Sequence, residues 1–93
     1  MNEATIAAML PMLKIDLGIT ATAYDDRLKQ YLANAAKEIE REGVKLDGCI
    51  DDQHLVIMYA AWQWRRRDSG EGMPRMVRYA LNNRVFSQKA NEE

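Results

Sequence analysis

Cysteine and histidine are the residues of this chain best suited to nucleophilic or metal chemistry, and each occurs once, as Cys49 and His54. A catalytic thiol needs a base that a third group orients, and the sequence indicates no such third group for this pair. A zinc site takes about four cysteine, histidine or carboxylate ligands at close spacing, and that spacing is missing as well. Glu38, Glu40 and Glu42 alternate along a predicted helix, so they spread around it and do not form a carboxylate pair. We therefore predict a protein that is not an enzyme and uses no cofactor or metal.

Arginine is the other residue type with distinctive chemistry, and its distribution along the chain is uneven. Thirteen Lys and Arg against fourteen Asp and Glu leave a net charge of −1, whereas residues 65–89 carry seven basic and two acidic residues, a local charge of +5. Guanidinium groups pair in a forked geometry with carboxylates or phosphates. The same charges could also serve only the dipole of a helix end and solubility, and both interpretations stay open. Protein carboxylates are the favoured partner because the rest of the chain is acidic and supplies them.

Two tryptophans lie at the start of this basic stretch. Trp62 and Trp64 point about 200° apart on a helix, so one can lie in the core while the other faces outward. An exposed tryptophan beside arginine is typical of protein interfaces, and packing under a following helix is the alternative. The candidate interface residues are Trp64, Arg65, Arg66, Arg67, Arg75, Arg78 and Arg84.

Two helical patterns in the first half of the chain precede these side chains. Residues 5–17 place their apolar side chains on one helical face, although Pro11 predicts a kink or a division into two short helices. Residues 23–42 form the clearest pattern, with a capping residue expected at Thr22 and a stop at Gly43. The charged face of this second helix is predicted to be exposed to water.

Two further helices are predicted in the second half. Residues 51–68 begin at an expected cap, Asp51, and contain the run 55–62, which is apolar on every side. In a chain this short the other segments can cover about two thirds of such a helix, so we expect part of it to meet a partner chain. Pro74 opens the fourth helix, and residues 85–93 are expected to form a mobile tail. The apolar face of the fourth helix is expected to consist of Met76, Val77, Ala80 and Leu81.

Length and composition agree with one small helical domain. The chain has 93 residues, 47% of them hydrophobic, with two prolines and five glycines. We predict an all-α bundle of about four helices spanning residues 1–93, with a long second helix and a buried third helix. A membrane span needs about 20 apolar residues and the longest apolar run here has eight. One cysteine and the absence of a signal-like start predict a soluble protein of a reducing compartment.

Several short motifs, taken in order, carry a resemblance to a known family. The first half contributes an element ending in Lys14-Ile15-Asp16, an acidic cap and an Ala-rich helix, namely Leu13-Lys14-Ile15-Asp16, Asp25-Asp26, Leu28, Tyr31-Leu32, Ala35-Ala36 and Ile39. The second half contributes a central helix ending in aromatic and basic residues and a final element, namely Tyr59, Trp62, residues 65–67, Met73-Pro74-Arg75, Arg78, Leu81, Asn82 and Asn83. Over residues 10–88 this order resembles the head-tail connector proteins of tailed bacteriophages, also called head-completion or adaptor proteins. Pro11 and Asp51-Asp52 depart from the pattern.

The resemblance implies a helical virion protein of the phage neck, assembled in the cytoplasm of a bacterial host. Such a protein forms a ring of about 12 subunits under the portal, extends the DNA channel and docks the next neck or tail protein. Its implied partners are other copies of itself, the portal protein and a neck, stopper or tail-completion protein, with non-specific contact to DNA in the channel and no membrane. Ring subunits meet through unlike faces, so we expect residues 65–67 and Trp64 to lie at or near that junction.

The alternative function is a small helical DNA-binding or regulatory protein. The helix opened by Pro74 would then enter the major groove, with Arg75 and Arg78 on one face. The neutral net charge and the lack of a helix-turn-helix spacing weigh against this alternative. An accessory subunit of an enzyme is a third hypothesis.

Overall fold

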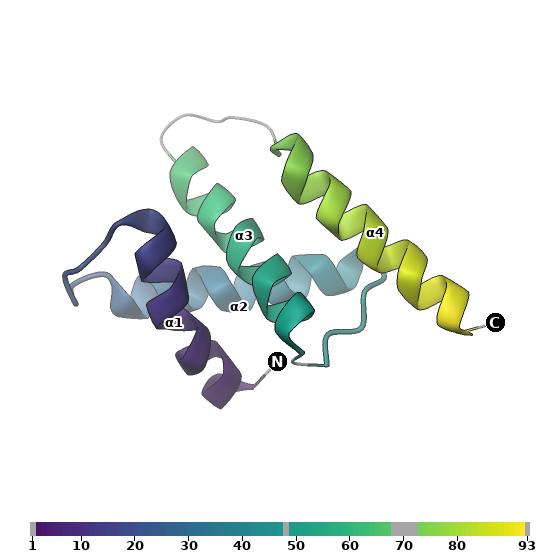
Figure 1. Ribbon diagram of the computed structural model, residues 1–93. Coiled ribbons are helices and arrows are strands. Elements are labelled where there is room, and N and C mark those ends of the chain that lie inside the picture. The colour runs from purple at the N-terminus through teal and green to yellow at the C-terminus, as the bar shows by residue number, and fades with distance from the viewer. Residues whose placement is uncertain (1, 48, 68–72, 93) are drawn as a thin grey trace.

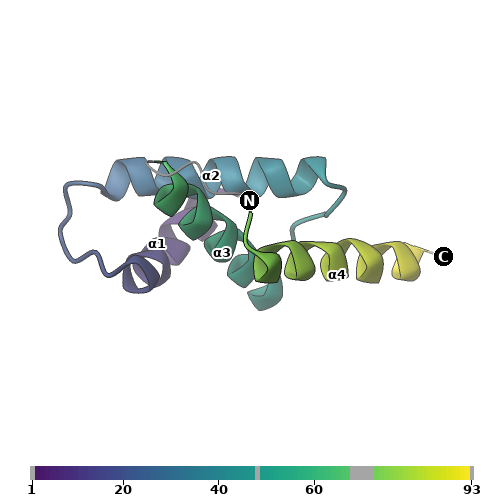
Figure 2. The same ribbon diagram turned by 90° about the horizontal axis from the view of Figure 1, so that it is seen from above.

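The structure, a computed structural model, describes residues 2–47, 49–67 and 73–92, with side chains described up to residue 88. This part of the chain forms four helices, α1 (Glu3–Leu17), α2 (Asp25–Arg41), α3 (Ile50–Arg66) and α4 (Arg75–Glu92), so the predicted all-α fold is confirmed. The helices form two layers: α1, α3 and α4 lie in front, and α2 runs behind them (Figure 1). Figure 2, seen from above, shows the two layers edge-on, with α4 extending beyond one end of α2. The molecule is correspondingly flat, about 45 × 30 × 18 Å.

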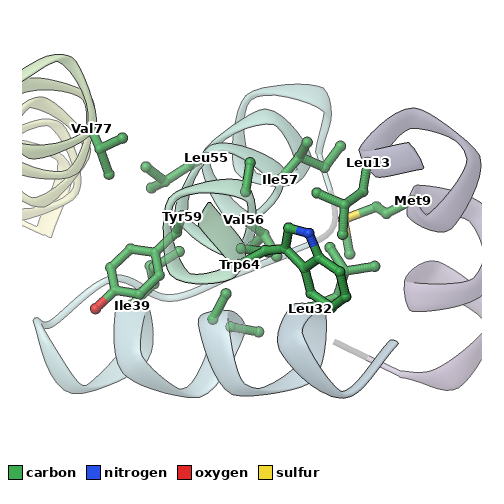
Figure 3. Close-up of a cluster of buried hydrophobic side chains, with 14 of the residues drawn as sticks. Met9, Leu13, Leu32, Ile39, Leu55, Val56, Ile57, Tyr59, Trp64 and Val77 are labelled. Carbon is green, nitrogen blue, oxygen red and sulfur yellow. The ribbon is translucent and has the colours of Figure 1, made fainter. Parts of the chain in front are cut away.

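The core lies where α3 crosses the other helices. α3 contacts α2, α1 and α4, and apolar side chains of all four helices meet around it. Figure 3 shows Met9 and Leu13 of α1 on one side of this cluster and Val77 of α4 on the other. Trp64 and Leu32 lie between α3 and α2 in the same cluster. The position of α3 between three helices explains why its sequence is apolar in every direction.

Most of the apolar run of α3 is covered within the chain, and contact of its half-buried positions, Met58 and Trp62, with a partner chain stays a prediction. The apolar positions of α3 from residue 55 to residue 61 are all at most 7% exposed except the half-buried Met58. The chain achieves this coverage because α1 and α4 flank α3 on opposite sides and α2 closes the back. The large apolar side chains that remain exposed lie chiefly on α4 and α1, and Ile50 at the start of α3 is also 70% exposed.

The start and end of α1 are set by a capping side chain and a glycine, and its interior differs from prediction at one residue. The Asn2 side chain caps the helix by accepting the Thr5 N–H at 2.9 Å. Gly18 ends it with a positive φ of 69°, a conformation in which glycine carries no steric cost. Of the two outcomes predicted at Pro11, the division into two helices is absent: one helix continues to Leu17, with Pro11 exposed.

The starts of α2 and α3 differ from prediction by one to two residues. The N-cap of α2 is Tyr24, and the Asp25 N–H donates to the Thr22 carbonyl at 3.2 Å. The Asp25 carboxylate binds Lys14 Nζ at 2.8 Å. The N-cap of α3 is Cys49, before the expected Asp51, which lets Asp52 turn inward. In both places an acidic side chain forms a tertiary contact that local sequence rules do not consider.

The predicted mobile tail is helical in the structure. α4 continues to Glu92, with Val85 half-buried against the core. The Gln88 side chain binds the loop between α2 and α3 twice: Lys45 N–H donates to Gln88 Oε1 at 2.6 Å, and Gln88 Nε2 donates to the Lys45 carbonyl at 2.7 Å. These contacts are hydrogen bonds between a side chain and the backbone. The polar sequence of this segment therefore gives no sign that it is attached to the rest of the molecule. Within the described residues, no helix combines the length and apolar character that a membrane span requires.

Two isoleucines provide a matched test of the core. Ile39 is fully buried and Ile15 is 80% exposed. Ile39→Ala is expected to lower the free energy of unfolding by about 2–4 kcal/mol through lost burial and a residual cavity, whereas Ile15→Ala should change it by less than about 1 kcal/mol. Urea unfolding followed by circular dichroism measures both, and similar losses at the two positions would contradict this core.

Candidate functional site

Trp64 is a core residue and not an exposed interface residue. It is 7% exposed, and its ring packs edge-to-face against Tyr24 and Tyr31 at centroid distances of 5.7 and 5.3 Å. Trp62, the other member of the pair, is half-buried and packs against Tyr59. One tryptophan therefore does point inward, as the spacing allowed, but it is the one that we had assigned to the subunit junction.

The three arginines at the end of α3 are exposed and have different contacts. Arg65 Nη2 donates to the Asp16 carbonyl at 3.0 Å, so it binds the C-terminal end of α1, where the helix dipole favours a cation. Arg66 and Arg67 instead stack on tryptophan rings, at 4.6 Å from Trp62 and 4.0 Å from Trp64. Stacking holds a guanidinium plane in a fixed orientation while its edge can still donate hydrogen bonds.

The two stacked arginines border a groove between α2 and α3. This groove has a volume of about 640 Å³. It is lined by Arg27, Gln30, Tyr31, Asn34, Glu38, Gln63, Arg66 and Arg67. Three guanidinium groups, three amides and a single carboxylate form a surface that suits a carboxylate or phosphate of a partner. Sequence reasoning missed Arg27, because only the packing of α2 on α3 brings it beside the end of α3.

Arg84 occupies a different place from the other arginines. Its Nε lies 2.7 Å from Oδ1 of Asp52, which is fully buried. The second oxygen of Asp52 accepts the Asp47 N–H at 3.0 Å, and Arg84 Nη2 lies 3.7 Å from Cys49 Sγ. Arg84 therefore fastens α4 to the start of α3 and is not a surface group in this chain. Sequence reasoning assigned Asp52 only to the helix dipole and gave no sign of this pair.

The group around Cys49 is better described as an ion-pair network than as a metal or catalytic site. Ligand atoms of Asp47, Cys49 and Asp52 lie within 4.8 Å of one another, but the Arg84 guanidinium already supplies the positive charge there. A backbone hydrogen bond from Asp52 lowers the pKa of the Cys49 thiol, yet the Asp47 and Asp52 carboxylates and burial raise it more, and the net pKa is raised. A protonated thiol is a poor nucleophile. His54 lines a different hollow, between α3 and α4.

The remaining predicted site residues lie near the start of α4. Arg75 is exposed, and Arg78 Nη1 lies 3.9 Å from Glu42 Oε1 in an ion pair that is half-exposed at both ends. Such pairs contribute little to stability. The structure thus does not gather the seven candidate interface residues into one site.

One face of α4 carries large apolar side chains that the chain leaves uncovered. Met76, Tyr79 and Phe86 are 74%, 61% and 76% exposed. Their spacing of three and seven residues places them on one side of the helix, whereas Val77 and Leu81 face the core on the other. The prediction that Met76 belongs to the buried face is therefore wrong. We call Met76, Tyr79 and Phe86 the outer face of α4.

The buried ion pair allows a first prediction. Arg84→Met leaves the Asp52 carboxylate buried without its cation, and the free energy of unfolding is expected to fall by about 3 kcal/mol. Arg78→Met is the matched control, because it removes an exposed arginine from a longer ion pair and should cost less than about 1 kcal/mol. Equal losses in urea unfolding would show that the Asp52–Arg84 pair does not hold α4.

A second prediction concerns acid stability. The Cys49 N–H donates to Asp47 at 3.0 Å, and this hydrogen bond is the main cause that lowers the pKa of Asp47 from 3.8 to about 2. A lowered folded-state pKa stabilises the fold above the unfolded-state value, and that contribution is lost as the pH falls from about 3.8 to 2. The thermal midpoint of Asp47→Asn should therefore depend less on pH in this range than that of the unchanged protein. Identical curves for Asp47→Asn and the unchanged protein would disprove the effect.

Comparison with protein-family models, curated proteins and solved structures gives no match to this chain. The function must therefore be inferred from the residues themselves. Three features are available for that purpose: the arginine groove between α2 and α3, the fixed attachment of α4, and the outer face of α4.

Proposed function

We propose that this protein is a structural virion protein, a head-tail connector that forms a ring under the portal, extends the DNA channel and docks the next neck or tail protein. The observation that carries the proposal is α4, which is fastened to the bundle on one face and exposes large apolar side chains on the other. Exposed apolar patches of this kind mark sites that another chain covers. A protein that functions by assembling with other chains requires such an exposed contact surface.

The attachment of α4 is suited to presenting a contact surface. The helix is held by the Asp52–Arg84 pair in the middle and by the Gln88–Lys45 hydrogen bonds near its end. A surface that is already fixed loses less conformational entropy when it binds a partner. The outer face of α4 is thus preorganised for contact although few apolar residues anchor the helix.

The arginine groove supports a second contact with a neighbouring chain. Arg66 and Arg67 are oriented by their tryptophan partners, and Arg27 faces them from α2. Planar guanidinium groups in fixed orientations favour forked pairing with carboxylates. In the proposed assembly these arginines meet acidic side chains of the portal or of an adjacent subunit.

The motif order over residues 10–88 is the remaining support, because it resembles the connector family and the four-helix architecture agrees with it. The proposal places the protein in the neck of the virion, with the portal and a neck, stopper or tail-completion protein as partners. In this proposal the protein functions by forming the ring and by binding its neighbours, which requires no catalytic group.

The contacts of α4 weigh against the alternative of a DNA-binding helix. Arg84 is paired with Asp52 inside the molecule, and Arg78 lies near Glu42. The outer face of α4 carries three large apolar side chains beside the exposed Asn82 and Asn83, whereas major-groove readout relies mainly on side chains that hydrogen-bond to base edges. Of the two arginines assigned to the major groove, Arg78 thus lies near a carboxylate, and Arg75 is the one outside these two ion pairs.

Mass photometry of the purified protein with the portal protein encoded in the same genome tests the proposal. We expect ring-sized complexes with the portal, and Arg66→Glu combined with Arg67→Glu should weaken them at least roughly tenfold. Lys37→Glu is the control, because this lysine is exposed on α2 and lines neither the arginine groove nor the hollow beside α1.

Two outcomes would contradict the proposal. One is a protein that ignores the portal at every concentration. The other is binding to duplex DNA that is sequence-selective and falls steeply with salt, which would instead establish the DNA-binding alternative.

A further inference from the structure

The first helix leaves an apolar face uncovered. One side of α1 is buried in the core through Met9, Leu10 and Leu13. The opposite side is exposed and also apolar. It consists of Ala4, Ala8, Pro11, Met12 and Ile15, which we call the outer face of α1. A helix that is apolar on both sides is normally buried on both sides.

The outer faces of α1 and α4 belong to opposite flanks of the molecule. α3 contacts both helices, and Figure 1 shows α1 on one side of it and α4 on the other. One copy therefore cannot cover its own α1 with its own α4. Two copies placed side by side in the same orientation bring the α4 flank of one toward the α1 flank of the next, which is the arrangement that repeats in a ring.

The two faces also agree in length, shape and charge. At 1.5 Å per residue, Met76 to Phe86 spans about 15 Å and Ala4 to Ile15 about 17 Å. The α4 face carries long and aromatic side chains, whereas the α1 face is mostly alanine and proline. A hollow of about 600 Å³ borders this face at Ala4 and lies between α1 and α2, where Lys29, Gln30 and Ala33 form its other wall.

Charge favours the same pairing. α4 begins with the exposed Arg75, and α1 carries exposed acidic residues at both ends, Glu3 and Asp16. Contact between α4 and α1 brings opposite charges together where Arg75 lies near Glu3, whereas the Asp16 end of α1 already carries the Arg65 guanidinium. Contact of α4 with a second α4 in parallel would instead place arginine against arginine and would leave the outer face of α1 uncovered.

We propose that the outer face of α4 of one copy packs on the outer face of α1 of the next copy, so that identical chains join head to tail. The inference rests on the proposed function, because ring assembly is what requires two unlike faces of one chain to meet. It goes beyond that function by naming the junction. The arginine groove is then left for a different neighbour.

Sedimentation velocity of the purified protein without portal tests the junction. We expect concentration-dependent self-association, which Phe86→Glu and Ala8→Glu should each weaken by roughly tenfold or more, because each buries a carboxylate in the apolar contact. Both positions are exposed in the single chain, so the fold should persist, as circular dichroism can verify. Ala23→Glu is the matched control, an exposed alanine between α1 and α2 and outside both faces.

Mixing the two variants distinguishes a head-to-tail contact from a symmetric one. Phe86→Glu retains an intact α1 face and Ala8→Glu retains an intact α4 face, so the mixture should form one junction and stop at a one-to-one pair. An unchanged protein that stays monomeric at all accessible concentrations would overturn the inference. So would self-association that Ala8→Glu leaves intact, which indicates pairing of α4 with itself.

The portal experiment separates the two proposals. A chain that binds the portal yet never joins head to tail would disprove this junction and leave the connector function standing. Head-to-tail pairs that do not bind the portal would disprove the connector function and leave this junction standing.

Discussion

The ion pair between Asp52 and Arg84 is the interaction on which the arrangement of this molecule depends. A fully buried carboxylate is strongly unfavourable without a partner, so α4 cannot leave α3 without exposing or stranding that charge. The pair also organises the loop before α3, because Asp52 accepts the Asp47 N–H and Cys49 begins the helix beside it. α4 is thereby fixed in position while few of its apolar side chains are buried, and its outer face remains available for contact.

This division between attachment and exposure connects the fold with the proposed assembly. α3 takes the centre of the core and satisfies its own apolar surface within the chain. The helices that flank it, α1 and α4, each bury one face and expose another. A flat molecule with apolar faces on two opposite flanks has the shape of a subunit in a repeating array. The stacked Arg66 and Arg67 add a polar contact surface elsewhere on the same molecule.

Sequence reasoning predicted the elements of this fold better than their surfaces. Apolar spacing and the glycines at positions 18 and 43 identified four helices, because these signals are local. The buried role of Asp52, the inward position of Trp64 and the hydrogen bonds of Gln88 depend on which helices pack together, and no local rule carries that information. The apolar run of α3 correctly indicated burial, and most of that burial comes from helices of the same chain. The arginine groove likewise needed α2 to supply Arg27.

The proposed function places this chain in the neck of a phage particle, and electron cryomicroscopy of that neck tests the central claim most directly. The account predicts a ring of this protein directly beneath the portal, with α4 of each subunit in contact with its neighbour. A complete neck in which every ring is formed by other proteins would contradict it.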